Sequence, residues 1–575
     1  MKKNKLGLAV LSLLSLSLIA CGNNNNSATE KPNNSSTNNN TQLKDTTDTA
    51  TENKPSVSVI PEEEMTGGIV MTLDETGSYF IVTDYLSVEY DIVIPDVYQG
   101  KPVREIGEAA FRYRTIDSLT LPGSLRKIGK DAFLGLSSDS RLTDLVIPEG
   151  VEEIDDGAFL YCPTLTSVSL PKSLKKLGSG VFHLDSSIKK IKVAHDSEYF
   201  LTENNILYSK DKKSLYVYPA GLNFTSFDLP KEVERIENYA FYGNKVLTAI
   251  TIPANSELKV IGFRSLAAIT NLNNLRLEKA TKLTEIGELA LSEDPSLLKI
   301  TLPASLTKLS SGLFKGDSHL VNVVINGAYT EIPDECFNQC AKLTSVTLNN
   351  AITKIGKSAF YSCVSLAKLD LPESIEEIGE EAFGACVALK SIKISKKVTK
   401  IADRAFANCR ALTTIDLGEN ITEIGTSAFN GCSSLGTIDL SKTKITELKE
   451  TTFMSCSGMH EVFLPETLLT IGKSAFNSCS ELRRVLIPSH VTTIGESAFY
   501  SCKKLKYVYL PKSVKSIGTI AFRTIMDLEG TVNLYFEAAS FTNENTECGD
   551  NYTNGKKFFS KTISDFNTDS AGSLA

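Results

Sequence analysis

Residues 366–389 read LAKLDLPESIEEIGEEAFGACVAL, and this stretch decides the fold. Its first six residues end in Leu369-Asp370-Leu371, an alternation of apolar and polar side chains that predicts a half-buried strand. Pro372 ends the strand, because proline has no N–H to donate to a neighbouring strand. Two isoleucines then return the chain to the core.

The second half of the stretch predicts a turn that buries an aromatic ring. We expect Gly379 to let the chain turn and a short helical or 3-10 turn to follow through Glu381, Ala382 and Phe383. Phe383 would lie between successive coils, and Ala382 would be small because the next coil passes close by.

The same pattern recurs along most of the chain. Spacing is 23 residues almost throughout from Leu291 to Phe522, with one step of 24 residues at Phe453. Counting Leu266 and Leu291 as degenerate copies gives about 17 repeats of ~23 residues. One repeat cannot bury its apolar face alone, so stacked neighbours must form the core of a repeat solenoid. The register residues are Phe111, Phe133, Phe159, Phe182, Phe241, Leu266, Leu291, Phe314, Phe337, Phe360, Phe383, Phe406, Phe429, Phe453, Phe476, Phe499 and Phe522.

The pattern LxxLxLPxxIxxIGxxAFxxCxxL, complete from Leu366 to Leu389, resembles the BspA-like leucine-rich repeats of bacterial surface proteins. The resemblance covers roughly residues 90–535. It implies a curved, right-handed leucine-rich-repeat solenoid that is mainly β with short helical or 3-10 turns and has a parallel sheet on its inner face. It also implies export to the cell surface and adhesion to host or microbial partners. Where the copies depart from the pattern, as at Leu266 and Leu291, we expect irregular curvature.

The N-terminus has the form of a processing signal. Three lysines precede a mostly apolar run from Leu6 to Ile19, whose 14 residues are too few to span a bilayer as a helix. The run ends in Ala20-Cys21, which resembles the lipobox of bacterial lipoproteins. That resemblance implies a signal peptide at residues 1–20, cleavage after Ala20 and lipid attachment at Cys21, hence an extracytoplasmic protein anchored to the membrane and exposed at the cell surface. The alternative is an ordinary secretion signal with a chance cysteine.

Composition and register divide the mature chain into segments. Residues 21–62 are rich in Asn, Ser and Thr, which predicts a disordered tether with a reach of roughly 35 Å. The further segments are an N-terminal β cap at 63–100, repeats at 101–193, a hairpin insertion at 194–228, repeats at 229–522, and a C-terminal cap and tail at 523–575.

The insertion adds 36 residues, because Phe182 and Phe241 lie 59 apart instead of 23. Ile206–Tyr208 and Leu215–Tyr218 predict two strands around a Lys-rich turn, a hairpin that projects from the solenoid. Its tyrosines, at positions 208, 216 and 218, either bind a partner or pack the hairpin against the solenoid.

Nine cysteines lie three residues after a register phenylalanine, from Cys162 to Cys502. Disulfides are the first expectation for an exported protein. However, side chains stacked in register point in parallel, and Asn244, Asp185, Asp294 or Asp317 takes this position in other copies. We therefore predict a ladder of buried thiols that bond to turn backbone, and a reactive thiol at Cys548 in the tail.

The chain has no pattern typical of catalysis. Its five histidines are far apart, and GxSxG, HExxH and GxGxxG are absent from the sequence. The cysteine spacing fits no zinc site. We therefore predict a protein that is not an enzyme and uses no metal or cofactor. The formal net charge of −8 argues against nucleic acid as a partner.

We expect the strand that precedes the proline of each repeat to lie on the inner face of the solenoid, and near the C-terminal end these strands differ from the rest. The residues eight and ten positions after each register residue should face outward, and most are polar. Near the C-terminal end they become aromatic and apolar, which favours contact with a partner. The alternative is that these side chains only stabilise the sheet. The candidate patch is Glu461, Phe463, Arg484, Leu486, Tyr507 and Tyr509.

These observations predict a lipid-anchored, non-catalytic surface protein that binds a macromolecule. By the family resemblance, the partner is a host matrix protein or a microbial surface protein. The alternative is an envelope-structural protein that binds wall polymer or associates with itself.

Overall fold

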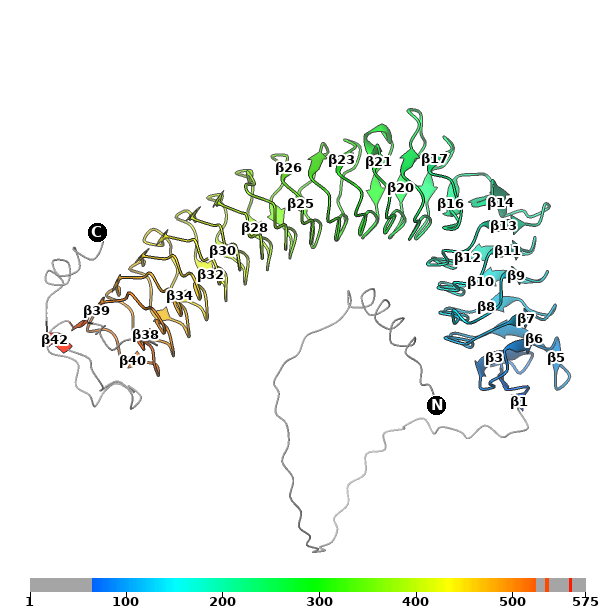
Figure 1. The fold of residues 1–575 in the computed structure, drawn as a ribbon, viewed down its shortest axis with the longest axis horizontal. Helices are drawn as coiled ribbons and strands as arrows, with labels where there is room; N and C mark the ends of the chain where they lie inside the picture. The colour runs from blue at the N-terminus through cyan, green and yellow to red at the C-terminus, as the bar shows by residue number, and fades with distance from the viewer. Residues whose placement is uncertain (1–64, 524–532, 537–557, 561–575) are drawn as a thin grey trace, which may run out of the picture.

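The computed structural model describes residues 65–523, 533–536 and 558–560, which form an open arc of stacked coils (Figure 1). The predicted signal peptide at 1–20, Cys21, the tether at 21–62 and most of the predicted C-terminal segment at 523–575 lie outside the described residues.

Most coils contribute two strands that pair in parallel with neighbouring coils. We call the first the long strand, although it has only two to four residues. The long strands are β4 (Asp91–Val93), β7 (Ser118–Thr120), β9 (Asp144–Val146), β11 (Ser167–Leu170), β13 (Lys190–Val193), β17 (Ser226–Asp228), β19 (Ala249–Thr251), β21 (Asn274–Leu275), β23 (Lys299–Leu302), β24 (Asn322–Ile325), β26 (Ser345–Thr347), β29 (Ser391–Lys393), β31 (Thr414–Asp416), β33 (Thr437–Asp439), β35 (Glu461–Phe463), β37 (Arg484–Leu486), β39 (Tyr507–Leu510), β41 (Asn533–Phe536) and β42 (Phe558–Ser560).

The second strand of a coil, the short strand, has two residues. Its second residue is the isoleucine of the repeat's Ile-Gly pair or the residue equivalent to it. The short strands are β8 (Lys127–Ile128), β10 (Glu153–Ile154), β12 (Lys176–Leu177), β18 (Arg235–Ile236), β20 (Val260–Ile261), β22 (Glu285–Ile286), β25 (Glu331–Ile332), β27 (Lys354–Ile355), β28 (Glu377–Ile378), β30 (Lys400–Ile401), β32 (Glu423–Ile424), β34 (Glu447–Leu448), β36 (Thr470–Ile471), β38 (Thr493–Ile494) and β40 (Ser516–Ile517).

Two antiparallel units interrupt this scheme. At the N-terminus β1 (Met65–Thr66), β2 (Ile69–Leu73) and β3 (Phe80–Tyr85) form an antiparallel meander. β3 then pairs in parallel with β6 (Lys101–Ile106), and β5 (Val97–Tyr98) pairs with β6 in the antiparallel direction. Between β13 and β17, β14 (Phe200–Glu203), β15 (Ile206–Ser209) and β16 (Ser214–Val217) form a second meander. β16 pairs in parallel with β18, so the inserted hairpin extends the short-strand sheet.

The predicted strand at Leu366–Leu371 is not formed, although its burial still alternates. The long strands of neighbouring coils are formed, and in β29 only the central Ile392 is buried. The predicted helical turn is also absent from this repeat, and the 3-10 helix of the described residues is η2 (Leu277–Lys279). Turns replace the predicted helix around Phe383, because residues 381 and 385 have left-handed φ values of 55° and 57°, which no right-handed helix accommodates.

The register phenylalanines stack as predicted. From Phe111 to Phe182 and from Phe314 to Phe522, successive rings lie nearly parallel with centroids 4.9 to 5.8 Å apart. The backbone N–H of Phe360 donates to the carbonyl of Ala382 in the next coil at 2.8 Å, and equivalent bonds recur along the solenoid. The alanine is fully buried where the coils meet, which confirms the expected reason for its small size.

Two coils have a tyrosine at the register position, and the sequence analysis missed them. Tyr218 stacks on Phe241 at 4.9 Å and donates its backbone N–H to Ala240 at 2.8 Å. Tyr85 packs on Phe111 at 5.5 Å. The signal was an aromatic residue 23 positions before Phe241 and another 26 positions before Phe111.

Paired charges on neighbouring short strands mark the register. Glu331, Lys354 and Glu377 stand opposite one another on β25, β27 and β28, and the Lys354 ammonium lies 3.1 Å from the Glu377 carboxylate. Lys400 and Glu423 repeat the arrangement on β30 and β32. Opposite charges stabilise directly opposed residues in a sheet, so this alternation favours the observed register over a slipped one.

The two kinds of strand lie at different depths in the arc. In Figure 1 the long strands β17, β21, β23 and β26 lie along the outer rim, and the short strands β20 and β25 lie inside them. A parallel sheet therefore faces the inside, as the resemblance implied, but the short strands build it. The long strands, which we had placed on the inner face, lie outside. Coils spread apart on the outside of a curve, and accordingly the long-strand ladder is interrupted more often than the short-strand sheet.

Candidate binding surfaces

The predicted patch lies on three neighbouring long strands of the C-terminal coils. Phe463 at the end of β35 and Leu486 at the end of β37 face solvent with 43% and 42% of their area exposed. The central residues Val462 and Val485 point into the core. The alternation of the strand therefore forces Phe463 and Leu486 outward, as the spacing predicted.

The other patch residues are less open to solvent. Arg484 lies 3.2 Å from the carboxylate of Glu461 on the neighbouring coil, and both side chains are largely covered. Tyr507 and Tyr509 form a small apolar cluster in which Tyr509 is only 7% exposed. Their strand, β39, pairs with β37 on one side and with β41 on the other. The apolar surface that a partner can reach is thus centred on Phe463 and Leu486.

The structure adds two exposed apolar residues that the sequence analysis did not single out. Val93 ends β4 and Val146 ends β9, with 65% and 67% of their area exposed. Both occupy the strand position that Phe463 has in β35. The signal in the sequence was an apolar residue two positions before the proline that ends the strand, as in Val93-Ile94-Pro95 and Val146-Ile147-Pro148, because Val146 follows Phe133 by 13 positions and not by ten.

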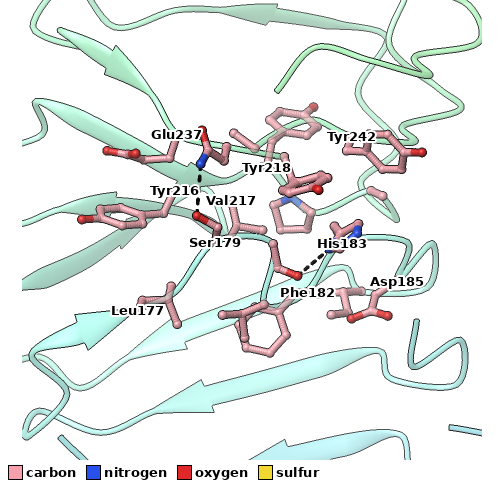
Figure 2. Close-up of a pocket in the computed structure, with 18 of the residues that line it drawn as sticks. Leu177, Ser179, Phe182, His183, Asp185, Tyr216, Val217, Tyr218, Glu237 and Tyr242 are labelled. Carbon is pink, nitrogen blue, oxygen red and sulfur yellow. Dashed lines mark hydrogen bonds between the residues drawn. The ribbon is translucent and has the colours of Figure 1, made fainter. Parts of the chain in front are cut away.

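A small cavity of about 50 Å³ lies where the inserted meander meets the preceding coil (Figure 2). Val217 and Tyr218 lie across it from Phe182 and His183. The His183 ring stacks on Tyr239 at 4.2 Å, and the amide of Asn238 donates to the Ser179 hydroxyl at 3.1 Å. Phe182 and Tyr218 are the register residues of successive coils, so the cavity separates these coils where other coils touch.

Burial sets the protonation of the polar groups around this cavity. Desolvation lowers the pKa of His183 to about 4, so the ring is neutral at pH 7. Desolvation likewise raises the pKa of Asp185 well above its ordinary value and that of Tyr218 to about 12. All three pKa shifts favour the neutral forms of these side chains.

The three tyrosines of the insertion differ in exposure. Tyr208 and Tyr218 are buried, and Tyr216 is partly buried against Phe200 with ring centroids 5.2 Å apart. Their rings pack the meander onto the solenoid on both of its sides.

A second depression is lined by lysines, but each has a partner. Lys397 lies 3.0 Å from Glu376, Lys396 lies 3.6 Å from Glu419, and Lys444 donates to the side chain of Asn420 at 3.2 Å. These side chains bridge neighbouring coils and leave no concentrated positive charge for an anionic ligand.

The predicted thiol ladder is present. All ten cysteines between residues 162 and 502 are free and buried. The nine that follow a register phenylalanine donate to the register carbonyl of the preceding coil, as Cys386 does to Phe360 at 3.1 Å. The Sγ to oxygen distances of this ladder run from 3.0 to 3.4 Å. Cys21 and Cys548 lie outside the described residues.

Where the ladder position is an aspartate, the hydrogen bond reverses. Asp317 accepts the backbone N–H of Asp294 at 2.8 Å, and Asp294 accepts that of Ile269 at 2.6 Å. The position thus bonds to neighbouring backbone either as donor or as acceptor, which explains the mixed residue types in the sequence.

Within the described ranges, no cluster of three or more His, Cys, Asp or Glu side chains is arranged to hold a metal ion. In the same part of the chain, no helix has the length and apolar character needed to cross a bilayer.

A family model described as the BspA type leucine-rich repeat region matches residues 93–209, 214–342, 312–435 and 399–529. Curated protein sequences gave no match.

Several solved structures of bacterial leucine-rich repeat proteins are similar to the chain. One, from Bacteroides ovatus, is 21% identical over 86% of this chain and 98% of its own, with a TM-score of 0.41. Another, from Eubacterium ventriosum, is 23% identical over 64% of this chain and 93% of its own, with a TM-score of 0.42. A leucine-rich cell surface protein from Faecalibacterium prausnitzii is 17% identical over 84% of this chain and 95% of its own, with a TM-score of 0.30.

Proposed function

The chain belongs to the BspA-type leucine-rich repeat family, and on this basis we propose that it is a non-catalytic scaffold that binds a macromolecular partner at the bacterial cell surface. The observation that carries the proposal is the exposed pair Phe463 and Leu486, which replaces polar residues on two neighbouring long strands. Apolar side chains that protrude from a rigid sheet desolvate readily against a partner, and they lose little conformational entropy on binding. The partner class is a host matrix protein or a microbial surface protein.

The test uses the chain from residue 22 onward, so that the lipid-bearing cysteine is absent. Binding to extracellular-matrix and plasma proteins is measured for this chain and for a Phe463→Ser/Leu486→Ser variant. The matched control is Val93→Ser/Val146→Ser, which changes exposed residues at the same strand position in the N-terminal coils. We expect saturable binding that weakens at least tenfold in the first variant and is unchanged in the control.

Two results would contradict the proposed patch. Equal loss of binding in both variants would place the contact elsewhere on the long strands. Absence of binding to every protein, together with sedimentation of the chain with cell-wall material, would support the envelope-structural alternative.

Membrane attachment is the second part of the proposal. Its support is the lipobox-like sequence that ends at Ala20-Cys21, where several acyl chains would hold the protein stably to a bilayer. In cells fed a palmitate analogue, the full chain should be labelled, and Cys21→Ser should abolish labelling and release the protein. Labelling that persists in Cys21→Ser would disprove attachment at this residue.

A further inference from the structure

The coil of Phe182 and the coil of Tyr218 are joined differently from the others. From Phe111 to Phe499, every register residue except Phe182 donates its backbone N–H to the next coil, at 2.7 to 3.2 Å. Gly157 and Tyr161 make the same kind of bond on either side of Phe159, but Gly180 and Leu184 make none on either side of Phe182. The continuous hydrogen-bond ladder of the register turns is therefore open at this one junction of the described solenoid.

The hydrophobic core is also divided at the junction. One cluster of buried residues runs from Ile69 to Ile191 and also includes Phe200 and Leu207 of the inserted meander, and the other begins with Ile206 and runs to Phe522. The two parallel sheets break here as well, since β13 does not pair with β17 and β12 does not pair with β18. Stacking of the register rings stops at Phe182 and resumes with Tyr218 on Phe241. Other sheet breaks occur along the arc, but the core is continuous across those.

The inserted meander lies between the two clusters and packs a separate set of side chains on each. Phe200, Leu207, Tyr216 and Val217 pack into or against the N-terminal cluster, whereas Ile206, Tyr208 and Leu215 belong to the C-terminal one. Polar contacts across the junction include the Asn238 to Ser179 hydrogen bond and the Gly221 N–H to Ile188 carbonyl bond at 2.9 Å. The cavity of about 50 Å³ lies between Phe182 and His183 on one side and Val217 and Tyr218 on the other. In Figure 1 the solenoid changes direction at this corner, between β13 and β16.

We infer that this junction is an articulation between an N-terminal arm, residues 69–193, and a C-terminal arm, residues 218–522, which change their relative angle while each arm stays rigid. Within an arm, bending one coil against the next must break hydrogen bonds and separate stacked rings in a packed core. At the junction the register hydrogen bonds and the stacking of register rings are absent, and the direct contacts that remain include the His183–Tyr239 ring stack and the two hydrogen bonds given above. Bending there deforms mainly the meander and the cavity. Phe463 and Leu486 belong to the C-terminal arm, and the articulation therefore sets the direction in which they face.

The first test measures the width of a distance distribution between spin labels, attached to p-acetylphenylalanine so that the native thiols stay untouched. One pair, at Val146 and Thr347, spans the junction. The control pair, at Thr251 and Asp439, lies within the C-terminal arm and is separated by the same number of coils. All four residues are exposed on long strands. We expect the first distribution to be at least twice as wide as the second. Equal widths would overturn the inference.

The second test closes the junction with a cross-link. In a Cys548→Ser background, Ser179→Cys/Asn238→Cys places a disulfide across the junction. Asp156→Cys/Ser179→Cys places one between the residues three positions before Phe159 and Phe182, in two neighbouring coils of the N-terminal arm, where the Ser179 N–H already bonds to Asp156 at 2.6 Å. Oxidation of the first pair should narrow the Val146–Thr347 distribution to the width of the control, and oxidation of the second pair should leave it broad. An unchanged width after the first cross-link would contradict an articulation.

Hydrogen exchange of the unmodified protein provides a test that no substitution can compromise. The amides of Gly180, Phe182 and Leu184 should exchange at least tenfold faster than those of Gly157, Phe159 and Tyr161, which occupy the same positions one coil earlier. Equal protection would show that the ladder is closed at the junction in solution.

Discussion

Gly379 and Ala385 flank the same register phenylalanine, but different forces select them. Gly379 has an ordinary φ, and a Cβ on it would lie 2.8 Å from backbone atoms of the preceding coil. Close approach of the coils, and not the freedom to turn, therefore explains this glycine, which corrects the sequence-based expectation. Ala385 has the left-handed φ of 57°, where any side chain is strained.

The two positions should respond in opposite ways to exchanging glycine and alanine. Gly379→Ala should lower the free energy of unfolding by about 1–3 kcal/mol, because the coils must move apart to admit the methyl group. Ala385→Gly should be neutral within about 1 kcal/mol, because relief of strain offsets the entropy gained by the unfolded chain. Thermal unfolding of the two variants checks this, and equal destabilisation would contradict it.

Asp294 and Asp317 are buried in neighbouring coils, and desolvation raises the pKa of both. In the unfolded chain these carboxyls ionise near pH 4, whereas in the folded protein they keep their protons to higher pH. The unfolded state therefore binds fewer protons above pH 4, and the stability contributed by these groups falls as the pH rises toward neutrality.

Asp317→Asn should remove part of this loss of folding stability between pH 4 and neutral pH. The amide oxygen can still accept the Asp294 N–H, and Asn244 already occupies the equivalent position in another coil. We expect the Tm at pH 7 to rise by roughly 2–4 °C and the decline in Tm between pH 4 and pH 7 to become shallower. Asp370→Asn, at an exposed carboxylate, is the control and should leave that decline unchanged. A variant that matches the wild type at pH 7 would argue against a protonated Asp317.

At the scale of the element, the thiol ladder ties each turn to the one before it. The thiols are buried, and desolvation raises their pKa, to about 12 for Cys409, Cys456 and Cys502. A buried, protonated thiol is a poor nucleophile and a poor substrate for oxidation.

The described cysteines should therefore resist labelling until the solenoid unfolds. In the chain from residue 22 with Cys548→Ser, a maleimide should modify none of the ten thiols in the native state and all of them in denaturant. Without that substitution, one thiol should react, at Cys548. Native labelling of ladder cysteines, or their loss as free thiols to disulfides, would contradict the structure.

At the scale of the whole molecule, the divided core predicts two unfolding units. The stability of a solenoid is approximately a sum over coils and their interfaces, so a weak interface separates cooperative blocks. Calorimetry should resolve two transitions, which correspond to the two arms.

Truncating one register ring in each arm should identify these transitions. Phe133→Ala and Phe406→Ala each empty a buried ring site, a change that usually costs about 3–5 kcal/mol. Phe133→Ala should lower only the transition of the N-terminal arm, and Phe406→Ala only that of the C-terminal arm. The corresponding Phe→Leu variants should have smaller effects, since leucine fills the site at positions 266 and 291. A single transition that both alanine variants lower equally would indicate one cooperative unit.

The sequence alone determined the solenoid, its register and the burial of the thiols. These features depend on which residues recur every 23 positions. Each repeat packs against a neighbour with the same pattern, so the residues of one repeat also define the surface that it contacts. The outward position of Phe463 and Leu486 followed from the same register. Tyr85 and Tyr218 escaped recognition because tyrosine filled the register position in place of phenylalanine, 26 positions before Phe111 in one case and within the insertion in the other.

Only the tertiary structure decided features that depend on how neighbouring coils meet in space. Gly379 is required by the approach of the preceding coil, Tyr509 is covered within its cluster, and the long strands lie on the outer rim of the arc. The open junction after Phe182 belongs to the same class. The sequence marks it only as 36 extra residues, and whether such an insertion projects, stacks or divides a core depends on which cluster each of its side chains enters.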